Sequence, residues 1–310
     1  MYTKIPTAGI SRKEWLRLRK NGIGGSDAAA VCGLNPYSSP MKVFIDKTNE
    51  DVADEDNESM RQGRDLEDYV AQRFMEATGI KVRRSNYMYK SNKYPFMFAD
   101  VDRLLVGCDA GLECKTASAY SADQWSDDKI PIHYYIQCQH YMAVTNKKEW
   151  YIAVLIMGRE FKYRKIERDE GLIQGLIILE EVFWENHVLT GSMPNPDGSE
   201  ACDEMLAKYY KGSKTGSKIQ LVGFDEKLKR RRELDELIKK METEKNEIDQ
   251  NLKMYLGENE IAENDTYKVS WKNVMSSRLD TKLLKEEHPE IYKEYLRDSS
   301  YRKLIVKSAA

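Results

Sequence analysis

The sequence predicts an α/β fold in which helices flank a mixed central β-sheet. Helical and strand-like patterns follow one another in the order α–β–β–β–α–β over residues 1–190, which is typical of a layered domain. With 310 residues and 41% hydrophobic content, the chain can form one large core or two domains. The composition then changes, so we expect a core at 1–190, a connecting segment at 191–223 and a C-terminal region at 224–310.

The first predicted elements are helical. Residues 9–20 are amphipathic around Trp15, and a glycine-rich turn leads into a short helix from about Ser26. Ser39 followed by Pro40 predicts a further helix, because proline fits the first helical position.

A longer helix is predicted from Glu58 to Thr78. Its apolar residues are spaced for one buried side, and Gly79 is typical of a helix stop. The acidic segment 51–58 before it is expected to be a loop. Three strands, a helix, two more strands and a long helix follow at IKVRRSNYMYK, PFMFADVDRLLV, GLECK, 130–145, EWYIAVLIMG, EFKYRKIER and 169–190.

The C-terminal region has a different pattern. The segment 191–223 is rich in Pro, Gly and Ser, which is typical of a connection. Large apolar residues then recur every seven positions, a spacing that predicts a coiled coil or a helical hairpin. They are Leu234, Met241, Ile248 and Tyr255, with Ile238 and Leu252 four positions after the first and third and Lys245 interrupting this second row. The tail predicts a strand in TYKVSWKN, a helix through KLLKEEHPEIYKEYL and a last strand in YRKLIVK.

Composition excludes several classes of protein. No apolar run is long enough to cross a membrane, and the N-terminus lacks the apolar stretch of a secretory signal. The five cysteines are odd in number and form no C-x-x-C pair, which favours reduced thiols and no structural zinc. We therefore expect a cytoplasmic protein.

The charge pattern leaves nucleic-acid binding open. A net charge of −2 excludes a generally basic nucleic-acid coat, yet basic residues cluster at 11–20, 83–93 and 227–232. A DNA enzyme of neutral net charge can line one channel with its cations. The alternative for each cluster is an ordinary solvated surface.

The most informative residues are Asp102, Glu113 and Lys115, in the pattern D-x10-E-x-K. On a strand GLECK, Glu113 and Lys115 share one face, and Cys114 faces the other way and offers only its backbone carbonyl. If Asp102 reaches this face, two carboxylates and a carbonyl form an oxygen site suited to Mg²⁺ or Mn²⁺. The spacing alone is weak, because 32% of the residues are charged.

Three further positions are candidates with plain alternatives. Glu67, on a predicted helix, could support a metal through water or could be an exposed carboxylate. Ser26 follows two glycines at a predicted helix start, where it could bind phosphate with Arg19 or simply cap the helix. On the helix at 130–145, Gln137 and Gln139 could contact a reacting water or the DNA backbone, or lie at the helix surface and core edge. The two interpretations are even for Gln137, and the surface or core edge is expected for Gln139.

Two histidines, His133 and His140, fit no triad or zinc pattern, and we expect them to be ordinary half-buried residues.

The order of these motifs is specific. R-x6-S precedes G-R-x-x-E, then D-x10-E-x-K, then a helix with Q-x-Q. In this order, residues 1–190 resemble the YqaJ-like viral recombinase or phage lambda exonuclease family, within the PD-(D/E)xK nuclease superfamily. One departure is Val101, which stands where the family has proline before the first acid.

The resemblance implies a role for each position. Asp102, Glu113 and the Cys114 carbonyl match the metal ligands, and Lys115 matches the catalytic lysine. Glu67 matches the helical glutamate near the metals. Gln137 matches the glutamine of the Q-containing helix, with Gln139 as the competing choice, and Arg19 and Ser26 match the pair that binds the 5′-phosphate.

The resemblance also implies a restriction-endonuclease-like core and an activity. That activity is a processive 5′→3′ alkaline-type exodeoxyribonuclease on double-stranded DNA ends, using two Mg²⁺ ions, with Mn²⁺ plausible. Its 3′ overhangs would serve phage-type recombination in the bacterial cytoplasm, with a phage or prophage origin. Implied partners are DNA and two further copies in a ring trimer. The C-terminal region could dock a RecT-type single-strand annealing protein, which the habit of the family favours, stabilise the oligomer, or contact DNA through Lys227 to Arg232.

Two other functions remain open at this point. One is another PD-(D/E)xK activity, such as a sequence-specific or RecB-like endonuclease. The other is a non-catalytic scaffold that assembles through the C-terminal region.

Overall fold

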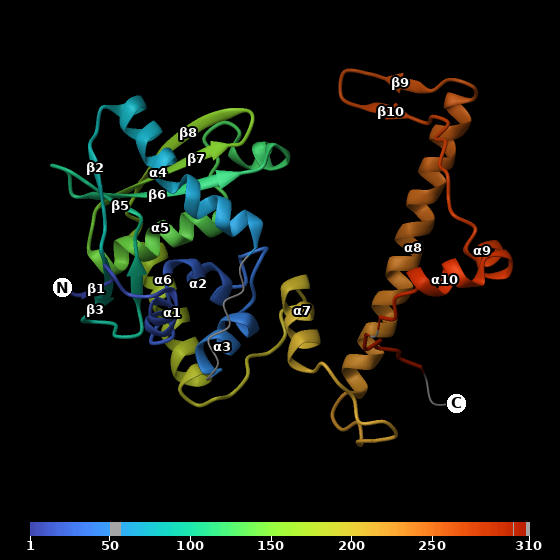
Figure 1. Cartoon of the computed structure of the whole chain (residues 1–310), viewed down its shortest axis with the longest axis horizontal. Helices are drawn as coiled ribbons and strands as arrows, with labels where there is room; N and C mark the ends of the chain where they lie inside the picture. Colours follow the sequence, from blue (N-terminus) through green and yellow to red (C-terminus); the bar gives the residue numbers. More distant parts are fainter. Residues whose placement is uncertain (50–56, 300, 308–310) are drawn as a thin grey trace. The chain divides into compact units, whose positions relative to one another are not determined.

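The computed structural model describes residues 1–49, 57–299 and 301–307 (Figure 1). The acidic segment 51–58, predicted as a loop, falls almost entirely outside the described residues. The chain divides into two compact units, Met1–Tyr210 and Lys211–Ala310. Each unit is described by itself.

A five-stranded mixed sheet forms the centre of the first unit, as predicted. Its strand order is β2-β5-β6-β7-β8, and only β6 and β7 run parallel. A smaller antiparallel sheet has the order β1-β3-β4. The bounds are β1 Tyr2–Pro6, β2 Val82–Arg84, β3 Tyr87–Ser91, β4 Phe98–Asp100, β5 Arg103–Leu105, β6 Ala110–Ala117, β7 Glu149–Ile156 and β8 Glu160–Glu167.

The predicted strand PFMFADVDRLLV is two strands that belong to different sheets. β4 pairs with β3, and β5 pairs with β2 and β6. The chain therefore passes from one sheet to the other at Val101 and Asp102. Strand β1 was not predicted, because its burial alternates weakly and it exists through pairing with β3, far along the chain.

Helices cover both faces of the central sheet, with α4 (Glu58–Thr78) against one face and α5 (Ile132–Thr145) against the other (Figure 1). Alternate residues of β7 serve the two faces. Trp150, Ile152 and Val154 pack in the cluster that contains Tyr141 and Met142 of α5. Tyr151, Ala153 and Leu155 pack in the cluster of Val70 and Phe74 of α4.

Helix caps predict the start of α3 and the end of α4. Ser39 caps α3 with Pro40 in its first turn, and Gly79 ends α4 with φ 72°. The segment 191–223, expected as a connection, contains α7, which buries Cys202 and Met205. The bounds are α1 Arg12–Arg19, α2 Gly25–Val31, α3 Pro40–Thr48, the 3₁₀ helix η1 Ala119–Trp125, α6 Glu170–Phe183, the π-helix η2 Trp184–Val188 and α7 Glu200–Tyr209.

The second unit contains one continuous 32-residue helix, α8 (Asp225–Leu256), rather than a helical hairpin. A hairpin of β9 (Ile261–Glu263) and β10 (Lys268–Ser270) follows. The predicted tail helix is two helices, α9 (Thr281–Glu287) and α10 (Pro289–Tyr295), because proline starts a new helix at 289. The predicted last strand at 301–307 is wrong, since these residues have no strand pairing in the described structure.

No helix among the described residues is both long and apolar enough to span a lipid bilayer.

Candidate active site

Strand β6 presents two of the predicted residues on one face. Lys115 Nζ lies 2.6 Å from Glu113 Oε1 on the α5 side of the sheet. Cys114 packs in the cluster on the α4 side, with Val70 and Phe74. This arrangement follows from the period of two in a strand.

Asp102 approaches the same strand from the crossing between the two sheets. Its Oδ2 accepts the backbone N–H of Cys114 at 2.7 Å. In an extended strand the N–H and C=O of one residue point to the same side. The Cys114 carbonyl therefore faces the side on which Asp102 lies, beyond the last pair of β5 with β6, Arg103 with Leu112.

Glu113 is held by one oxygen only. Its side chain is 2% exposed, and Oε1 accepts from both Lys115 and the Gln137 amide, at 2.6 and 2.8 Å. Oε2 is buried without a hydrogen-bond partner. Burial raises the pKa of Glu113, although Lys115 opposes this. A buried acceptor without a donor is costly, so Oε2 is the atom that a cation would satisfy.

The oxygens of this group suit a hard divalent cation. Burial and the nearby Glu113 carboxylate raise the pKa of Asp102 well above its ordinary value, and a cation would relieve that repulsion. In the described residues no three His, Cys, Asp or Glu side chains surround one point as a metal cluster. The candidate set consists of two carboxylates, Asp102 and Glu113, and the main-chain carbonyl of Cys114, which fits Mg²⁺ or Mn²⁺.

Glu67 lies beside this group but is bound to a partner that we did not predict. Arg103, only 3% exposed, forms ion pairs with Glu67 and Asp68 and donates to the Asp102 carbonyl at 2.8 Å. Arg103 therefore fixes both Glu67 and the backbone of the predicted metal ligand. Glu67 also contributes to the raised pKa values of Asp102 and Glu113, so it is close to both.

The two glutamines of α5 have different surroundings. The Gln137 amide bonds to Glu113 and to the Tyr141 hydroxyl, at 2.8 and 2.7 Å. Gln139 is fully buried and bonds to the Glu167 carbonyl and the Asp169 N–H, at 2.8 and 3.0 Å. The expectation that Gln139 lies at the helix surface or core edge is wrong, since it joins α5 to the turn before α6.

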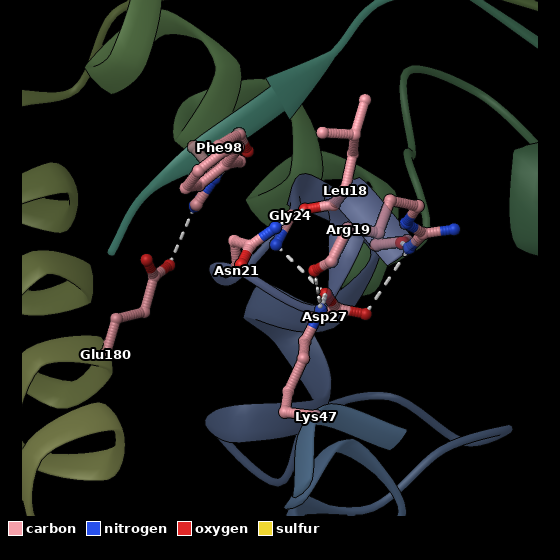
Figure 2. Close-up of polar contacts among 10 residues, drawn as sticks. Leu18, Arg19, Asn21, Gly24, Asp27, Lys47, Phe98 and Glu180 are labelled. Atoms are coloured by element: carbon pink, nitrogen blue, oxygen red, sulfur yellow. Dashed lines mark hydrogen bonds and ion pairs between the residues drawn. The ribbon is translucent and has the colours of Figure 1, made fainter. Parts of the chain in front are cut away.

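Arg19 and Ser26 meet as a second group. Arg19 Nη2 donates to Ser26 Oγ at 2.7 Å. The same nitrogen lies 3.5 Å from Asp27 Oδ1 (Figure 2). Buried Lys47 also binds Asp27, at 2.6 Å, and donates to the Arg19 carbonyl at 2.8 Å. Arg19 and Lys47 place two cations around the Asp27 carboxylate, and the Arg19 guanidinium can bind an anion.

The helix cap at this group differs from the prediction. Gly24, not Ser26, is the N-cap of α2, and its N–H donates to Asp27 Oδ2 at 2.9 Å. Ser26 is exposed, and its hydroxyl serves Arg19. Burial alone would raise the pKa of Asp27, but Lys47 and Arg19 outweigh burial and lower it to about 2.

Trp15 and Asp100 connect the two groups. The Arg19 guanidinium lies 4.9 Å from the centre of the Trp15 ring, a cation–π distance. Trp15 Nε1 donates to Asp100 Oδ2 at 2.7 Å. Asp100 ends β4, two residues before Asp102, so one short segment links the Arg19 group to the metal candidates.

Both histidines are more deeply buried than expected. His140 bonds Glu180 Oε1 and the Phe98 carbonyl, at 2.8 and 2.9 Å, and holds α6 and β4 together. Burial opposes protonation of His140, but Glu180 raises its pKa. His133 is 8% exposed, and burial with nearby Lys115 lowers its pKa to about 4.

Sequence reasoning missed four residues that position these groups: Trp15, Asp27, Lys47 and Arg103. Asp27 stands at the third helical position of α2, where an acid reaching back to the cap is a known signal. Lys47 follows Val43 at helical spacing on the buried side of α3, which marks a lysine with an interior partner. Arg103 adjoins Asp102 but carries no local signal of its own.

Comparison with known proteins gives the family. A family model described as the YqaJ-like viral recombinase domain matches residues 14–148. An uncharacterized protein, YqaJ of Bacillus subtilis (strain 168), is 37% identical over 305 residues, covering 97% of this chain and 96% of that protein.

Two solved structures share the fold. An alkaline exonuclease from Laribacter hongkongensis (LHK-Exo) has a TM-score of 0.50 and 18% identity, over 64% of this chain and 98% of that one. Its complex with dAMP gives the same values. The central mixed sheet flanked by helices is thus similar to the alkaline exonuclease fold. Together with the match over nearly the whole length of the Bacillus protein, these findings show that the chain belongs to the YqaJ-like viral recombinase family.

Proposed function

We propose that this protein is a metal-dependent 5′→3′ exonuclease that acts on double-stranded DNA ends. The observation that carries the proposal is the state of Glu113. Lys115 and Gln137 hold its Oε1, and its Oε2 is buried without a partner beside Asp102. A carboxylate fixed in this way is prepared for a cation, and a lysine beside it suits phosphodiester hydrolysis.

Asp102, Glu113 and the Cys114 carbonyl would hold the cation, and Glu67 would contact it through water. Two divalent ions bound there would supply Lewis-acid chemistry, acidifying the attacking water and stabilising the leaving 3′-oxygen. Lys115 positions the water and offsets negative charge that develops on the phosphoryl oxygens.

The remaining residues of the site fix this geometry. Gln137 holds Glu113, and Arg103 holds both Glu67 and the Asp102 backbone. Because these contacts are formed within the folded protein, the proposed metal ligands are held in position before substrate binds.

The direction of cutting rests on Arg19 and Ser26. Their side chains, joined at 2.7 Å, would bind the 5′-phosphate left by each cut. The guanidinium can bind phosphate with two parallel hydrogen bonds. Asp27 and Lys47 hold the group in place from the buried side.

Assembly and partners extend the proposal. A ring of three copies would place cationic residues around DNA even though the net charge is −2. The second unit would dock a single-strand annealing protein of the RecT type, and the 3′ overhangs would pass to that partner. The apolar row on α8 supports docking, since Leu234, Met241, Ile248 and Tyr255 are 42%, 69%, 56% and 82% exposed.

A plasmid digest tests the proposed function. Linear duplex with 5′-phosphates should be degraded in Mg²⁺, closed circular plasmid should survive, and EDTA should stop the reaction. Cutting of the closed circle would indicate an endonuclease instead. No Mg²⁺-dependent release of nucleotides from either DNA would leave only the scaffold function.

Lys115→Ala assigns the chemistry in the same assay. It should abolish digestion and preserve DNA binding in a gel-shift assay. Unchanged turnover in this variant would remove Lys115 from the mechanism.

A further inference from the structure

A row of aromatic side chains runs from the candidate catalytic lysine to the surface. Lys115 Nζ lies 4.6 Å from the centre of the Tyr134 ring. The Tyr134 and His133 ring centres are 4.0 Å apart, and those of His133 and Tyr37 are 5.8 Å apart at 84°. The row joins β6, the start of α5 and the turn between α2 and α3.

Tyr134 is half-buried and His133 is 8% exposed, whereas Tyr37, at the outer end of the row, is 65% exposed. Trp125 supports the row from the interior, stacked on Tyr134 at 5.7 Å and 27°. The Tyr37 N–H donates to Asn35 Oδ1 at 2.9 Å, which fixes the turn that presents the ring. Tyr37 is therefore a solvent-facing aromatic side chain whose ring packs against the buried His133 and whose backbone is fixed by the turn.

A single exposed tyrosine is common on protein surfaces and does not by itself indicate a binding site. Two further observations indicate one here. His133 Nε2 is buried without a hydrogen-bond partner, which is unusual for a polar atom of the interior. The inner end of the row contacts Lys115, the residue assigned to the reacting phosphate. A ligand that places a phosphate at Lys115 would bring the rest of its nucleotide toward these rings.

We propose that Tyr37 is a stacking platform for a nucleobase of the DNA strand whose phosphate lies at Lys115. This inference rests on the proposed function and adds a base-binding subsite to it. Stacking on an aromatic ring tolerates every base, because each base has a π-face. Such a subsite suits an enzyme that must accept DNA ends of any sequence.

The first measurement is DNA binding without turnover. Fluorescence anisotropy of the full chain with a 5′-phosphorylated duplex in EDTA should show roughly tenfold weaker binding for Tyr37→Ala. Tyr37→Phe and Tyr37→Trp keep a ring and should bind like the parent. Tyr209→Ala is the matched control, since Tyr209, the last residue of α7, is 55% exposed and its ring centre lies 4.9 Å from that of Tyr210. Its binding should not change.

The second measurement locates the base. Abasic nucleotides are placed one at a time at the two positions nearest the 5′ end. At one of them the penalty of Tyr37→Ala should disappear, since no base remains to stack. Equal penalties on intact and abasic duplexes would overturn the stacking role, as would wild-type binding by Tyr37→Ala.

A parallel digest of the parent protein in Mg²⁺ separates the two proposals. Digestion with no effect of Tyr37 on binding overturns the platform and keeps the exonuclease. Binding that depends on Tyr37 and on one base, without digestion, keeps the platform and overturns the exonuclease. If neither digestion nor Tyr37-dependent binding is observed, both proposals are overturned.

Discussion

The Tyr141 ring lies directly against the backbone of Gly25. A Cβ atom built on Gly25 would be 2.5 Å from Cε1 of Tyr141, closer than real Cβ contacts allow. Tyr141 also bonds Gln137, which bonds Glu113. The absence of a side chain at Gly25 thus permits the contact on which the position of Glu113 depends.

Gly25→Ala should therefore disturb both stability and the site. Because Tyr141 is fixed by neighbours, overpacking should lower the free energy of unfolding by about 1–3 kcal/mol. Nuclease turnover should fall as well, since the Gln137 contact shifts. Gly175→Ala is the control: nothing lies within 4 Å of its Cβ, and it sits inside α6. That change should stabilise the protein by roughly 0.5–1 kcal/mol. Urea unfolding of both variants measures this, and equal effects would contradict the steric argument.

Arg103→Gln should lower the free energy of unfolding, because it leaves the repulsion between Glu67 and the neighbouring acids uncompensated. Without the guanidinium, Glu67 loses its ion-pair partner and remains beside Asp102 and Glu113. We expect a loss of about 1–3 kcal/mol, less than for a fully buried pair because Glu67 is 27% exposed. Adding Glu67→Gln should restore part of the loss, since it removes the unpaired charge. Purely additive effects in urea unfolding would show that the two residues act independently.

The lowered pKa of Asp27 should make the stability of the folded protein sensitive to acid. Its pKa in the folded protein is about 2, below its ordinary value of 3.8, so its contribution is present above about pH 4. The contribution is lost as the pH falls from about 4 to about 2. The shift corresponds to about 2 kcal/mol at neutral pH. Asp27→Asn should be less stable than the parent at pH 5, and the difference should shrink toward pH 2. A difference that stays constant with pH would remove Asp27 from the acid response.

Local sequence predicts the parts of the site that depend on one element. The period of two in β6 is enough to place Glu113 and Lys115 together, and helix caps locate α3 and the end of α4. Local sequence could not predict that Asp102 reaches Glu113 and Lys115. Its position depends on the crossing of the chain between two sheets, and the apolar run PFMFADVDRLLV looks like one continuous strand.

Contacts between distant elements escaped prediction. Lys47 reaches Asp27 and Arg103 reaches Glu67 through packing between elements. The spacing of Lys47 places it on the buried side of α3, but local sequence does not identify the partner of either residue. β1 likewise exists only because β3 offers it an edge. At 301–307 the composition favours a strand, but no strand forms in the described structure because no partner strand pairs with it.

Arg19→Ala tests the proposed direction of cutting. The loss of activity should be greatest on 5′-phosphorylated ends, since the guanidinium beside Ser26 is the proposed phosphate-binding group. A fall of about tenfold or more in kcat/KM is expected for these ends, in line with a charged hydrogen bond. Duplexes with 5′-hydroxyl ends, digested in parallel, provide the comparison. An equal loss on both kinds of end would argue against a phosphate pocket.

The apolar row on α8 predicts what kind of partner it binds. Acids flank the row at Glu242, Glu244 and Asp249, and Lys245 interrupts it, so two copies paired in parallel along this face would bring like charges together. A partner helix with lysine or arginine beside its apolar face would instead gain complementary pairs. We therefore expect Ile248→Glu to abolish co-purification with the annealing protein and to leave DNA digestion unchanged. Gln250→Glu adds the same charge on the opposite side of α8 and should leave co-purification intact. Unchanged partner binding in Ile248→Glu would move the docking surface away from this row. Cysteine cross-links between two copies at position 248 would show that the row pairs with itself.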